Sequence, residues 1–450
     1  MNKTLSITII GILCLSIASS VILIAYAASQ SIDSATQTSI ASTDWPMFHH
    51  DLAHTGYNSA AGPTTNQLAW NYTAVGGMWS SPAISDGVVF AGTLQHGAMY
   101  AWNATTGSLL WNYTAGGQIY SSPTVANGMV YFGSTNHKVY ALDASNGNSI
   151  WNFTTGSEVH SCASVVNDVV YIGSSDNETY ALNATNGNLI WSFKTGDNVI
   201  SSPLVVNGVV YFGSYDHEVY ALNASTSAKI WNFTAQASVE SSPAYANGVV
   251  YVNSHDNNTY ALDALTGTEL WNVTTGYDLC VQASPAVANG ILFTGGSYDN
   301  NIYAYNATNG AQIWNYTTGG GIFSAPAVGG NVVYVTSFDN STYALNAQTG
   351  AFLWSFKTNG LLYSSPAVAN GLLYVTSYDK NIYAIGQVPS PFPSPTTSTS
   401  TSPSTTETPQ ASQTPGTTTT TSYTTYYIIA AVVIIIIIVA AVAMVLRRRK

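Results

Sequence analysis

The sequence predicts an all-β fold built from eight copies of one unit of about 40 residues. The first observation is a tryptophan that recurs at near-constant spacing, as Trp70, Trp111, Trp151, Trp191, Trp231, Trp271, Trp314 and Trp354. The second is a Ser-Ser-Pro motif, in which alanine once replaces the proline, at Pro82, Pro123, Ala163, Pro203, Pro243, Pro285, Pro326 and Pro366. Both motifs occur eight times, so the chain repeats one supersecondary unit eight times.

Each unit contains four short strands, as residues 201–234 illustrate. The expected strands are Ser201–Val206, Val209–Gly213, Glu218–Asn223 and a fourth around Trp231. Between the first two lies Asn207-Gly208, a pair that tolerates positive φ and favours a two-residue hairpin turn. Four short strands in about 40 residues are typical of a propeller blade.

The two ends of the repeat array predict how the ring closes. The last unit has three strands and stops at Gly386 without a tryptophan, whereas the strand Leu68–Asn71 precedes the first Ser-Ser-Pro motif. If this first strand pairs with the last unit, it completes the blade and removes a bare sheet edge. We therefore predict an eight-bladed β-propeller of four-stranded antiparallel blades over residues 45–386.

The segments before the propeller predict export. Residues 1–27 combine Lys3, an apolar stretch and an Ala25-Tyr26-Ala27 cleavage site, which is the pattern of a secretory signal peptide. The apolar stretch is long, so an uncleaved amino-terminal anchor is the alternative. Residues 28–44 form a polar linker.

The segments after the propeller predict a stalk and an anchor. Residues 387–425 are rich in Ser, Thr and Pro, which suits an O-glycosylated stalk or a plain disordered linker. Residues 426–446 lack charge and are long enough for a transmembrane helix, and the basic tail 447–450 places the carboxyl end in the cytoplasm. The expected protein is a single-pass cell-membrane protein with an extracellular propeller.

The charge balance excludes one class of partner. Residues 45–386 contain five Lys, no Arg and 18 acidic residues, a net charge of −13. Such a surface repels phosphate backbones, so we expect no nucleic-acid binding.

The three cysteines exclude a disulfide framework, and Cys162 and Cys280 lie in distant units, so we predict no disulfide between them.

The repeat resembles the tryptophan-docking motif of the pyrroloquinoline quinone (PQQ) propeller superfamily. The pattern Ala-Leu-Asn/Asp-Ala-x-x-Gly-x-x-x-Trp occurs at 141–151, 181–191, 261–271 and 344–354, and the copy at 221–231 departs from it at Ser227. The opening Trp45-Pro46-Met47-Phe48-His49-His50-Asp51 and His54-Thr55-Gly56 also resembles the lead-in of these propellers. The resemblance covers about three-quarters of the chain.

For activity, the resemblance implies two alternatives. The superfamily includes dehydrogenases that hold the tricarboxylate PQQ with Arg or Lys, bind Ca²⁺ through acidic and amide oxygens and often carry adjacent cysteines. It also includes non-catalytic members, such as the envelope lipoprotein that assists outer-membrane barrel assembly. This propeller has no Arg and no Cys-Cys pair, so we expect no cofactor and consider PQQ with Ca²⁺ only under the enzymatic alternative.

A candidate ligand site follows from the position three residues before each repeated proline. This position varies, although the framework around it repeats, and it lies where the chain enters the innermost strand at one mouth of the central channel. The residues are Trp79, Tyr120, His160, Ile200, Glu240, Gln282, Phe323 and Tyr363. In ring order the aromatic residues face the polar ones, so the mouth could stack a sugar ring or peptide and hydrogen-bond its edge. Alternatively, these side chains simply plug the channel.

Two further clusters could bind cations, but we assign no metal to either. One comprises a turn aspartate in each of six blades, Asp176, Asp216, Asp256, Asp299, Asp339 and Asp379, with Asn136 in another blade. Each aspartate more simply caps its own turn. The other cluster is His49, His50 and His54, for which a packed lead-in is the simpler interpretation.

Thirteen Asn-x-Ser/Thr sequons lie in the propeller, and export would expose them to N-glycosylation. They are Asn71, Asn103, Asn112, Asn152, Asn177, Asn183, Asn223, Asn232, Asn257, Asn272, Asn306, Asn315 and Asn340. Six directly follow the repeated tryptophan, where strand alternation should point the asparagine outward.

Three functions remain open. The first is a membrane-anchored surface propeller that binds a glycan or envelope protein, or acts as a scaffold or adhesion module, without catalysis. The second is an extracytoplasmic PQQ-dependent oxidoreductase. The third is a structural module of a surface layer that has no ligand.

Overall fold

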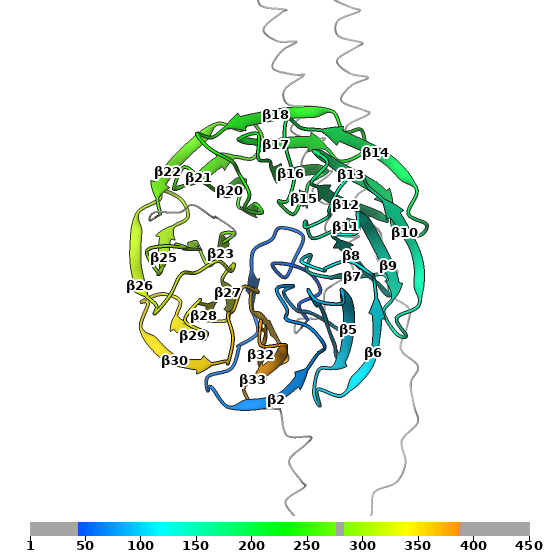
Figure 1. Ribbon diagram of the computed structural model, residues 1–450. Coiled ribbons are helices and arrows are strands. Elements are labelled where there is room, and N and C mark those ends of the chain that lie inside the picture. Colours follow the sequence, from blue (N-terminus) through cyan, green and yellow to red (C-terminus); the bar gives the residue numbers. More distant parts are fainter. Residues whose placement is uncertain (1–43, 276–282, 388–450) are drawn as a thin grey trace, which may run out of the picture. The chain divides into compact units, whose positions relative to one another are not determined.

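The computed structural model describes residues 44–275 and 283–387, and these form a ring of β-sheets around a central axis (Figure 1). The described residues contain 33 strands and no helix, and the strands form eight sheets. The predicted eight-bladed propeller is therefore confirmed. Blade one contains, from the axis outward, β3 (Ala83–Ser85), β4 (Val88–Gly92), β5 (Ala98–Asn103) and β6 (Leu109–Thr114).

The next six blades repeat this order. Blade two has β7 (Thr124–Ala126), β8 (Met129–Ser134), β9 (Lys138–Asp143) and β10 (Ser149–Thr154), and blade three has β11 (Ser164–Val166), β12 (Val169–Ser174), β13 (Glu178–Asn183) and β14 (Leu189–Lys194). Blade four has β15 (Leu204–Val206), β16 (Val209–Gly213), β17 (Glu218–Asn223) and β18 (Lys229–Thr234), and blade five has β19 (Ala244–Ala246), β20 (Val249–Ser254), β21 (Asn258–Asp263) and β22 (Glu269–Thr274). Blade six has β23 (Ala286–Ala288), β24 (Ile291–Gly295), β25 (Asn301–Asn306) and β26 (Gln312–Thr317), and blade seven has β27 (Ala327–Gly329), β28 (Val332–Thr336), β29 (Ser341–Asn346) and β30 (Phe352–Lys357).

Blade eight closes the ring as predicted. It combines β31 (Ala367–Ala369), β32 (Leu372–Thr376) and β33 (Asn381–Ile385) with the early strand β2 (Leu68–Thr73) as its outermost member. The register pairs Trp70 with Ala384 and Thr73 with Asn381. Blade seven differs from the prediction, because β1 (Tyr57–Asn58) of the lead-in adds a fifth strand parallel to β27.

Each tryptophan of the repeat joins its blade to the next one. The Trp111 indole Nε1 donates to the carbonyl oxygen of Ala144 over 2.9 Å, and the same bond recurs around the ring. Gly147, at φ 75°, lies against the Trp111 ring so closely that a Cβ there would come within 2.6 Å of it. The repeated glycine is therefore needed for its positive φ and for the close approach of the ring.

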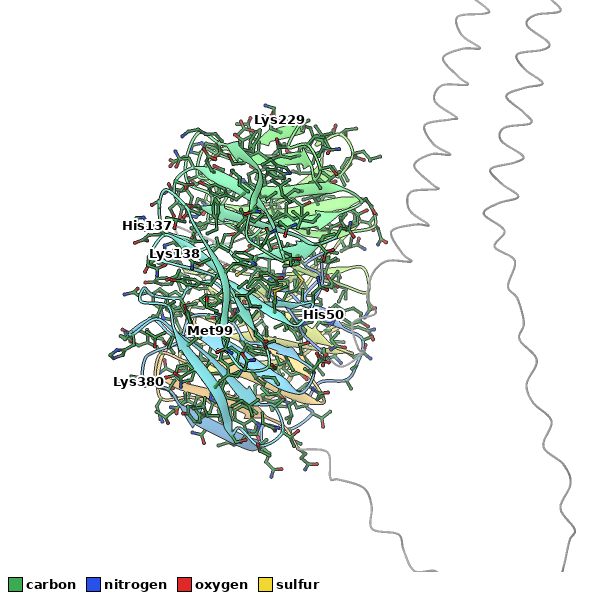
Figure 2. The ribbon with its side chains drawn as sticks, turned by 90° about the vertical axis from the view of Figure 1, so that its right-hand side faces the viewer. His50, Met99, His137, Lys138, Lys229 and Lys380 are labelled. Atoms are coloured by element: carbon green, nitrogen blue, oxygen red, sulfur yellow. The ribbon has the colours of Figure 1, made fainter. Side chains whose placement is uncertain are left out.

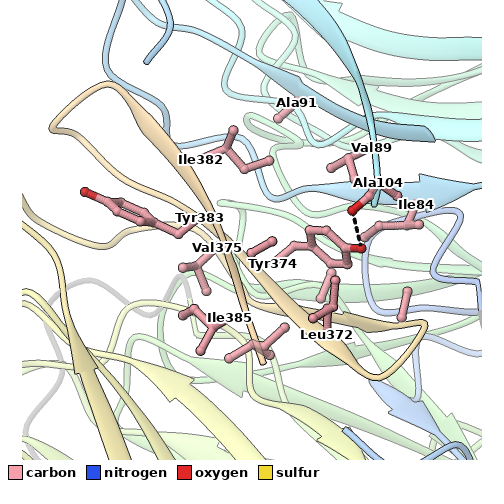
Figure 3. Packing of buried hydrophobic residues seen from close by; sticks show 14 of the residues in the cluster. Ile84, Val89, Ala91, Ala104, Leu372, Tyr374, Val375, Ile382, Tyr383 and Ile385 are labelled. Atoms are coloured by element: carbon pink, nitrogen blue, oxygen red, sulfur yellow. Dashed lines mark hydrogen bonds between the residues drawn. The ribbon is translucent and has the colours of Figure 1, made fainter. Parts of the chain in front are cut away.

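The last junctions follow the same rule with substituted partners. In the other blades the acceptor carbonyl lies in the turn between the third and fourth strands. Blade eight lacks this turn, because its fourth strand is β2, from the start of the chain. The Trp354 indole therefore donates to Pro63 O in the lead-in, over 3.3 Å. Figure 3 shows the neighbouring junction between blades eight and one, where the Tyr374 hydroxyl donates to Ala104 O over 3.2 Å among buried apolar side chains. Trp70 of β2 donates to the same carbonyl over 2.9 Å, so the amino-terminal segment contributes to both junctions of blade eight.

A belt of hydrogen bonds follows the second serine of each Ser-Ser-Pro motif around the channel. The Ser202 backbone N–H donates to Ser242 Oγ over 2.9 Å, and equivalent bonds join most neighbouring blades. Cys162 occupies one position of this belt, where its Sγ accepts from Ser122 N–H and its own N–H donates to Ser202 Oγ. We call these residues the serine belt.

Most of the predicted flanking segments lie outside the described residues. These are the signal peptide 1–27, the linker 28–44 except Asp44, the stalk 387–425 except Gln387, the transmembrane helix 426–446 and the tail 447–450. Within the part of the chain that the structure describes, no helix has the length and apolar character to span a membrane.

Candidate functional site

The two ends of the central channel are built differently, and the lead-in forms one of them. Backbone hydrogen bonds join Trp45 to Ile84 and Ala53 to Tyr245, and Asn58 Nδ2 donates to Val368 O. Further bonds reach the innermost strands of blades two, six and seven. The lead-in accordingly occupies the centre of the ring (Figure 1). It packs at one end of the channel and ties together blades that are distant in sequence.

Two of the lead-in histidines, His49 and His54, are buried at this end as neutral side chains. His49 Nδ1 lies 3.0 Å from His54 O, and His54 Nδ1 lies 3.2 Å from Pro243 O. Burial lowers the pKa of His49 to about 3, and the neighbouring His54 lowers it further. Burial likewise lowers the pKa of His54 to about 4. His49 and His54 are therefore packed side chains of the lead-in, whereas His50 is half-buried.

The acidic residue beside them caps the lead-in turn. Asp51 Oδ1 accepts from the backbone N–H groups of Ala53 and Thr55, each over 3.0 Å, and Oδ2 accepts from the Thr55 hydroxyl over 2.6 Å. Burial raises the pKa of Asp51, but its contacts with His50 and Thr55 outweigh this and hold it below its usual value. Across residues 44–275 and 283–387, no three His, Cys, Asp or Glu side chains are grouped to hold a metal ion.

The opposite end, which we call the mouth, carries the variable residues before each repeated proline. Four of them form a contiguous aromatic arc of partly exposed side chains from four successive blades, Phe323, Tyr363, Trp79 and Tyr120. The Trp79 and Tyr363 rings stack with centroids 3.9 Å apart, and Tyr120 meets Trp79 edge-on at 5.4 Å. The sequence therefore identified side chains that do come together, although their sequence separation reaches 284 residues between Trp79 and Tyr363.

A second row of aromatic residues, which the sequence analysis missed, extends this arc outward. Phe338 lies 4.1 Å from Phe323 and 4.4 Å from Tyr363 between ring centroids. Tyr378 and Tyr298 continue the row, with 45% and 54% of their surface exposed. All three precede the turn aspartate of their blades, at another variable position of the repeat that could have been compared in the same way.

The other half of the mouth is polar and holds two histidine–carboxylate pairs. His160 Nε2 lies 2.8 Å from Glu158 Oε2, and His255 Nε2 lies 2.9 Å from Glu240 Oε2. The Glu240 side chain is 7% exposed, whereas that of Glu158 is 48% exposed. Ile200 lies between them and is partly exposed. Gln282, the remaining predicted residue of this arc, lies outside the described residues.

A shallow cavity of about 360 Å³ adjoins the aromatic arc on the same face. It is lined by Val75, Gln95, His96, Tyr378 and Lys380, and Tyr378 also contacts Trp79. In the side view of Figure 2, Lys138, His137 and Lys380 project from this face, whereas His50 of the lead-in lies toward the other. The mouth therefore combines exposed aromatic surface, a hollow and nearby polar groups.

The six turn aspartates lie on this face and serve as turn caps, as the simpler interpretation predicted. Asp176 Oδ1 accepts from Glu178 N–H, while its Oδ2 accepts from the Tyr180 hydroxyl and from Gly156 N–H. The other five aspartates accept in the same way from the residue two positions on and from the tyrosine four positions on. The bond from Gly156 adds a link to the preceding blade that the sequence did not reveal.

Cys162 is a buried free thiol whose place in the serine belt explains it. Burial raises the pKa of this thiol, and so it is a poor nucleophile. Cys280 lies outside the described residues, so the predicted absence of a disulfide stays a prediction.

The thirteen sequons divide into two structural groups. Asn71, Asn112, Asn152, Asn232, Asn272 and Asn315 lie on outermost strands and are exposed, which confirms the predicted outward direction. We call these the strand sequons. The turn sequons, which lie in or beside turns and are partly buried, are Asn103, Asn177, Asn183, Asn223, Asn257, Asn306 and Asn340. Glycosylation of either group stays a prediction.

The tryptophan-docked blades define a PQQ-like propeller, and comparison with known proteins identifies the family. The family described as outer membrane protein assembly factor BamB matches residues 55–198, 135–226, 196–325 and 298–388. These matches cover most of the chain, and the chain belongs to this family. A search of curated protein sequences found no match.

Solved structures share the fold at low sequence identity. BamB from Moraxella catarrhalis is 19% identical with a TM-score of 0.63, and the match covers 71% of this chain and 99% of that one. Quinohemoprotein alcohol dehydrogenase from Comamonas testosteroni is 15% identical with a TM-score of 0.65, covering 80% and 83%. A europium-containing methanol dehydrogenase is 13% identical with a TM-score of 0.64, covering 74% and 89%. Because the fold is shared by an assembly factor and by dehydrogenases, it leaves enzyme status unresolved.

Proposed function

We propose that this protein is a non-catalytic, membrane-anchored surface propeller that binds an apolar segment of an envelope protein at its mouth, and so acts as a scaffold or assembly module. The observation that carries this proposal is the continuous two-row aromatic surface at the mouth. Exposed aromatic clusters of this kind are typical of protein-binding surfaces. The name of the family, an assembly factor, agrees with this role.

A protein segment suits this surface better than a sugar does. Sugar rings stack on the free face of an aromatic ring, but Tyr363 covers one face of Trp79 at 3.9 Å, and Phe338 lies against both Phe323 and Tyr363. The rings therefore use part of their area on one another, which leaves fewer free faces for a sugar. Exposed Tyr378 can contact an apolar side chain of an extended chain, and the adjoining hollow, lined in part by Gln95, His96 and Lys380, can take its polar groups.

The residues present fit PQQ poorly, which weakens the enzymatic alternative. A tricarboxylate needs several cationic partners, whereas residues 45–386 contain no Arg and only five Lys, and the polar half of the mouth contains the carboxylates of Glu158 and Glu240. The direct test is to incubate the full chain with PQQ and Ca²⁺ and to measure dye-linked alcohol oxidation. Stoichiometric uptake of PQQ with turnover would establish the oxidoreductase in place of our proposal.

The binding proposal is tested by probing the full chain, purified in detergent, with a random peptide display library and with a glycan array. We expect enrichment of peptides rich in aromatic and aliphatic residues, and loss of at least about tenfold in affinity in Phe338→Ala/Tyr363→Ala. Leu265→Ala is the matched control, because Leu265 is 62% exposed and lies in a turn away from the mouth. Glycan binding without peptide enrichment, or equal affinity in the mouth variant, would contradict the proposal.

A further inference from the structure

The outermost strand of every blade presents the same surface pattern. These strands lie at the outer end of each sheet, so one side of their backbone has no neighbouring strand within the blade. Side chains before and after the buried tryptophan point outward, as Leu110 and Asn112 do around Trp111. The rim of the propeller is therefore a series of sheet edges, which are surfaces prone to pair with other chains.

An exposed apolar residue precedes the tryptophan in seven of the eight blades. These residues are Leu110, Ile150, Ile190, Ile230, Leu270, Ile313 and Leu353, and each is 45–51% exposed. A β-branched or leucine side chain on a free edge promotes edge-to-edge association unless charge or bulk covers it. Few charges are available for this purpose, because residues 45–386 contain only five Lys and no Arg.

The two outward positions that follow the tryptophan carry one of two residue pairs, Asn with Thr or Ser with Lys. Six blades carry a strand sequon, with Asn one residue after the tryptophan and Thr three residues after it. The other two blades carry Ser and Lys at these positions, Ser192 with Lys194 and Ser355 with Lys357. Both lysines are exposed, and they account for two of the five lysines in the propeller. At this position after the tryptophan, lysine therefore occurs only where the sequon is missing, although Lys229 and Glu269 place a charge before the tryptophan in two of the sequon blades.

We infer that the six strand sequons are N-glycosylation sites whose glycans cover the apolar sheet edges, in the way that Lys194 and Lys357 protect the other two. The acceptor asparagine and the apolar residue two positions before it share the outward face of one strand, so the first sugar lies beside that side chain. The seven turn sequons are partly buried and have no such edge to cover. The inference rests on export of the propeller, which is part of the proposed function.

The modification is a transfer from a polyprenyl-phosphate-linked oligosaccharide. The bond between sugar C1 and the phosphate oxygen breaks, and its electrons leave with the polyprenyl phosphate. A new bond joins C1 to Asn Nδ2, and this nitrogen loses one proton. No oxidant or reductant takes part.

The test is to express the full chain through the secretory pathway of a yeast host, to purify it in detergent and to measure occupancy of each sequon by peptide mass spectrometry. We expect the strand sequons to be occupied in most molecules, and the turn sequons to be occupied about threefold less or not at all. Strand sequons left bare, or turn sequons modified in preference to them, would overturn the assignment. This result does not depend on the mouth, so it is distinguishable from failure of the binding proposal.

The protective role needs two matched variants. In the first, the six strand asparagines become Gln, which removes the glycans and adds no charge in their place. In the second, they become Ser and each sequon Thr becomes Lys, as in Asn112→Ser/Thr114→Lys, which copies the pattern of blades three and seven. We expect the monomer fraction in size-exclusion chromatography to fall at least about twofold in the first variant and to be retained in the second.

Circular dichroism of each variant establishes that it is folded before the comparison is made. If the Gln variant does not fold, wild type trimmed by an endoglycosidase to the first sugar replaces it, and we expect its monomer fraction to fall below that of untrimmed wild type. A folded Gln variant, or a trimmed protein, as monomeric as untrimmed wild type would overturn the role of the glycans at these edges.

Discussion

The two ends of the channel share the same eight innermost strands but differ in what fills them. At one end, the lead-in makes backbone hydrogen bonds to several blades and buries two neutral histidines. At the mouth, partly exposed aromatic side chains contact one another and leave a hollow beside Tyr378. In our proposal, the lead-in end therefore has a structural role and the mouth has the binding role. Changes at the lead-in should therefore affect stability, and changes at the mouth should affect binding.

The largest expected effect is the pH dependence of the lead-in end. The folded pKa values of about 3 for His49 and about 4 for His54 lie below the usual 6.5, so the unfolded chain binds more protons as pH falls through this range. Stability from these groups is complete above pH 6.5 and is lost as pH falls toward 4. We expect a loss on the order of 5 kcal/mol, measured by urea unfolding from pH 7.5 to 4.

A variant isolates the histidine contribution from that of the carboxylates. His54→Gln removes one of the two titrating groups, so the difference in stability between pH 6.5 and pH 4 should shrink by about half. An unchanged difference would show that these histidines do not account for the acid sensitivity.

A smaller effect is expected from backbone strain in the lead-in. Gly56 has φ 64°, and a Cβ there would lie 2.9 Å from Ala286 Cβ and 3.0 Å from Pro326 O. Gly56→Ala should therefore lower the free energy of unfolding by about 2–3 kcal/mol in denaturant titration. Gly87→Ala is the matched control, because Gly87 also has positive φ, at 74°, but has open space around it. Its loss should be about 1 kcal/mol, and equal losses would contradict a tightly packed lead-in.

The smallest effect is expected in the serine belt. Cys162→Ser keeps an acceptor for Ser122 N–H and should change stability by less than about 1 kcal/mol, whereas Cys162→Ala leaves that N–H unpaired and should cost about 1–3 kcal/mol. Thermal unfolding of the two variants distinguishes these values. A Ser variant less stable than the Ala variant would show that the thiol is needed for packing and not as a hydrogen-bond acceptor.

Repetition made the fold predictable. The spacing of the tryptophans predicted the number of blades. The extra strand at Trp70 and the missing strand of the last unit predicted how the ring closes, because both are visible in the sequence. The lead-in was not predictable in this way. It occurs once, and its contacts with distant blades, such as His54 with Pro243, leave no periodic trace.

The candidate site was predicted only in part for a related reason. Aligning one variable position of the repeat found Trp79 and Tyr363, whose backbone places are equivalent. Phe338 belongs to a different position of the repeat, and only the path of the turn brings it against Tyr363. The pairing of His255 with Glu240 likewise depends on two segments of one blade meeting at the mouth.

The measurement that tests the separation of the two ends most directly is photo-crosslinking with a peptide selected by the full chain. The peptide carries a photoreactive phenylalanine, and adducts are mapped by mass spectrometry. We expect adducts on the aromatic residues of the mouth, at Tyr363, Phe338 and Tyr378, and their loss in Phe338→Ala/Tyr363→Ala but not in Leu265→Ala. Adducts mapped to the lead-in end or the outer rim, with the mouth unlabelled, would contradict it.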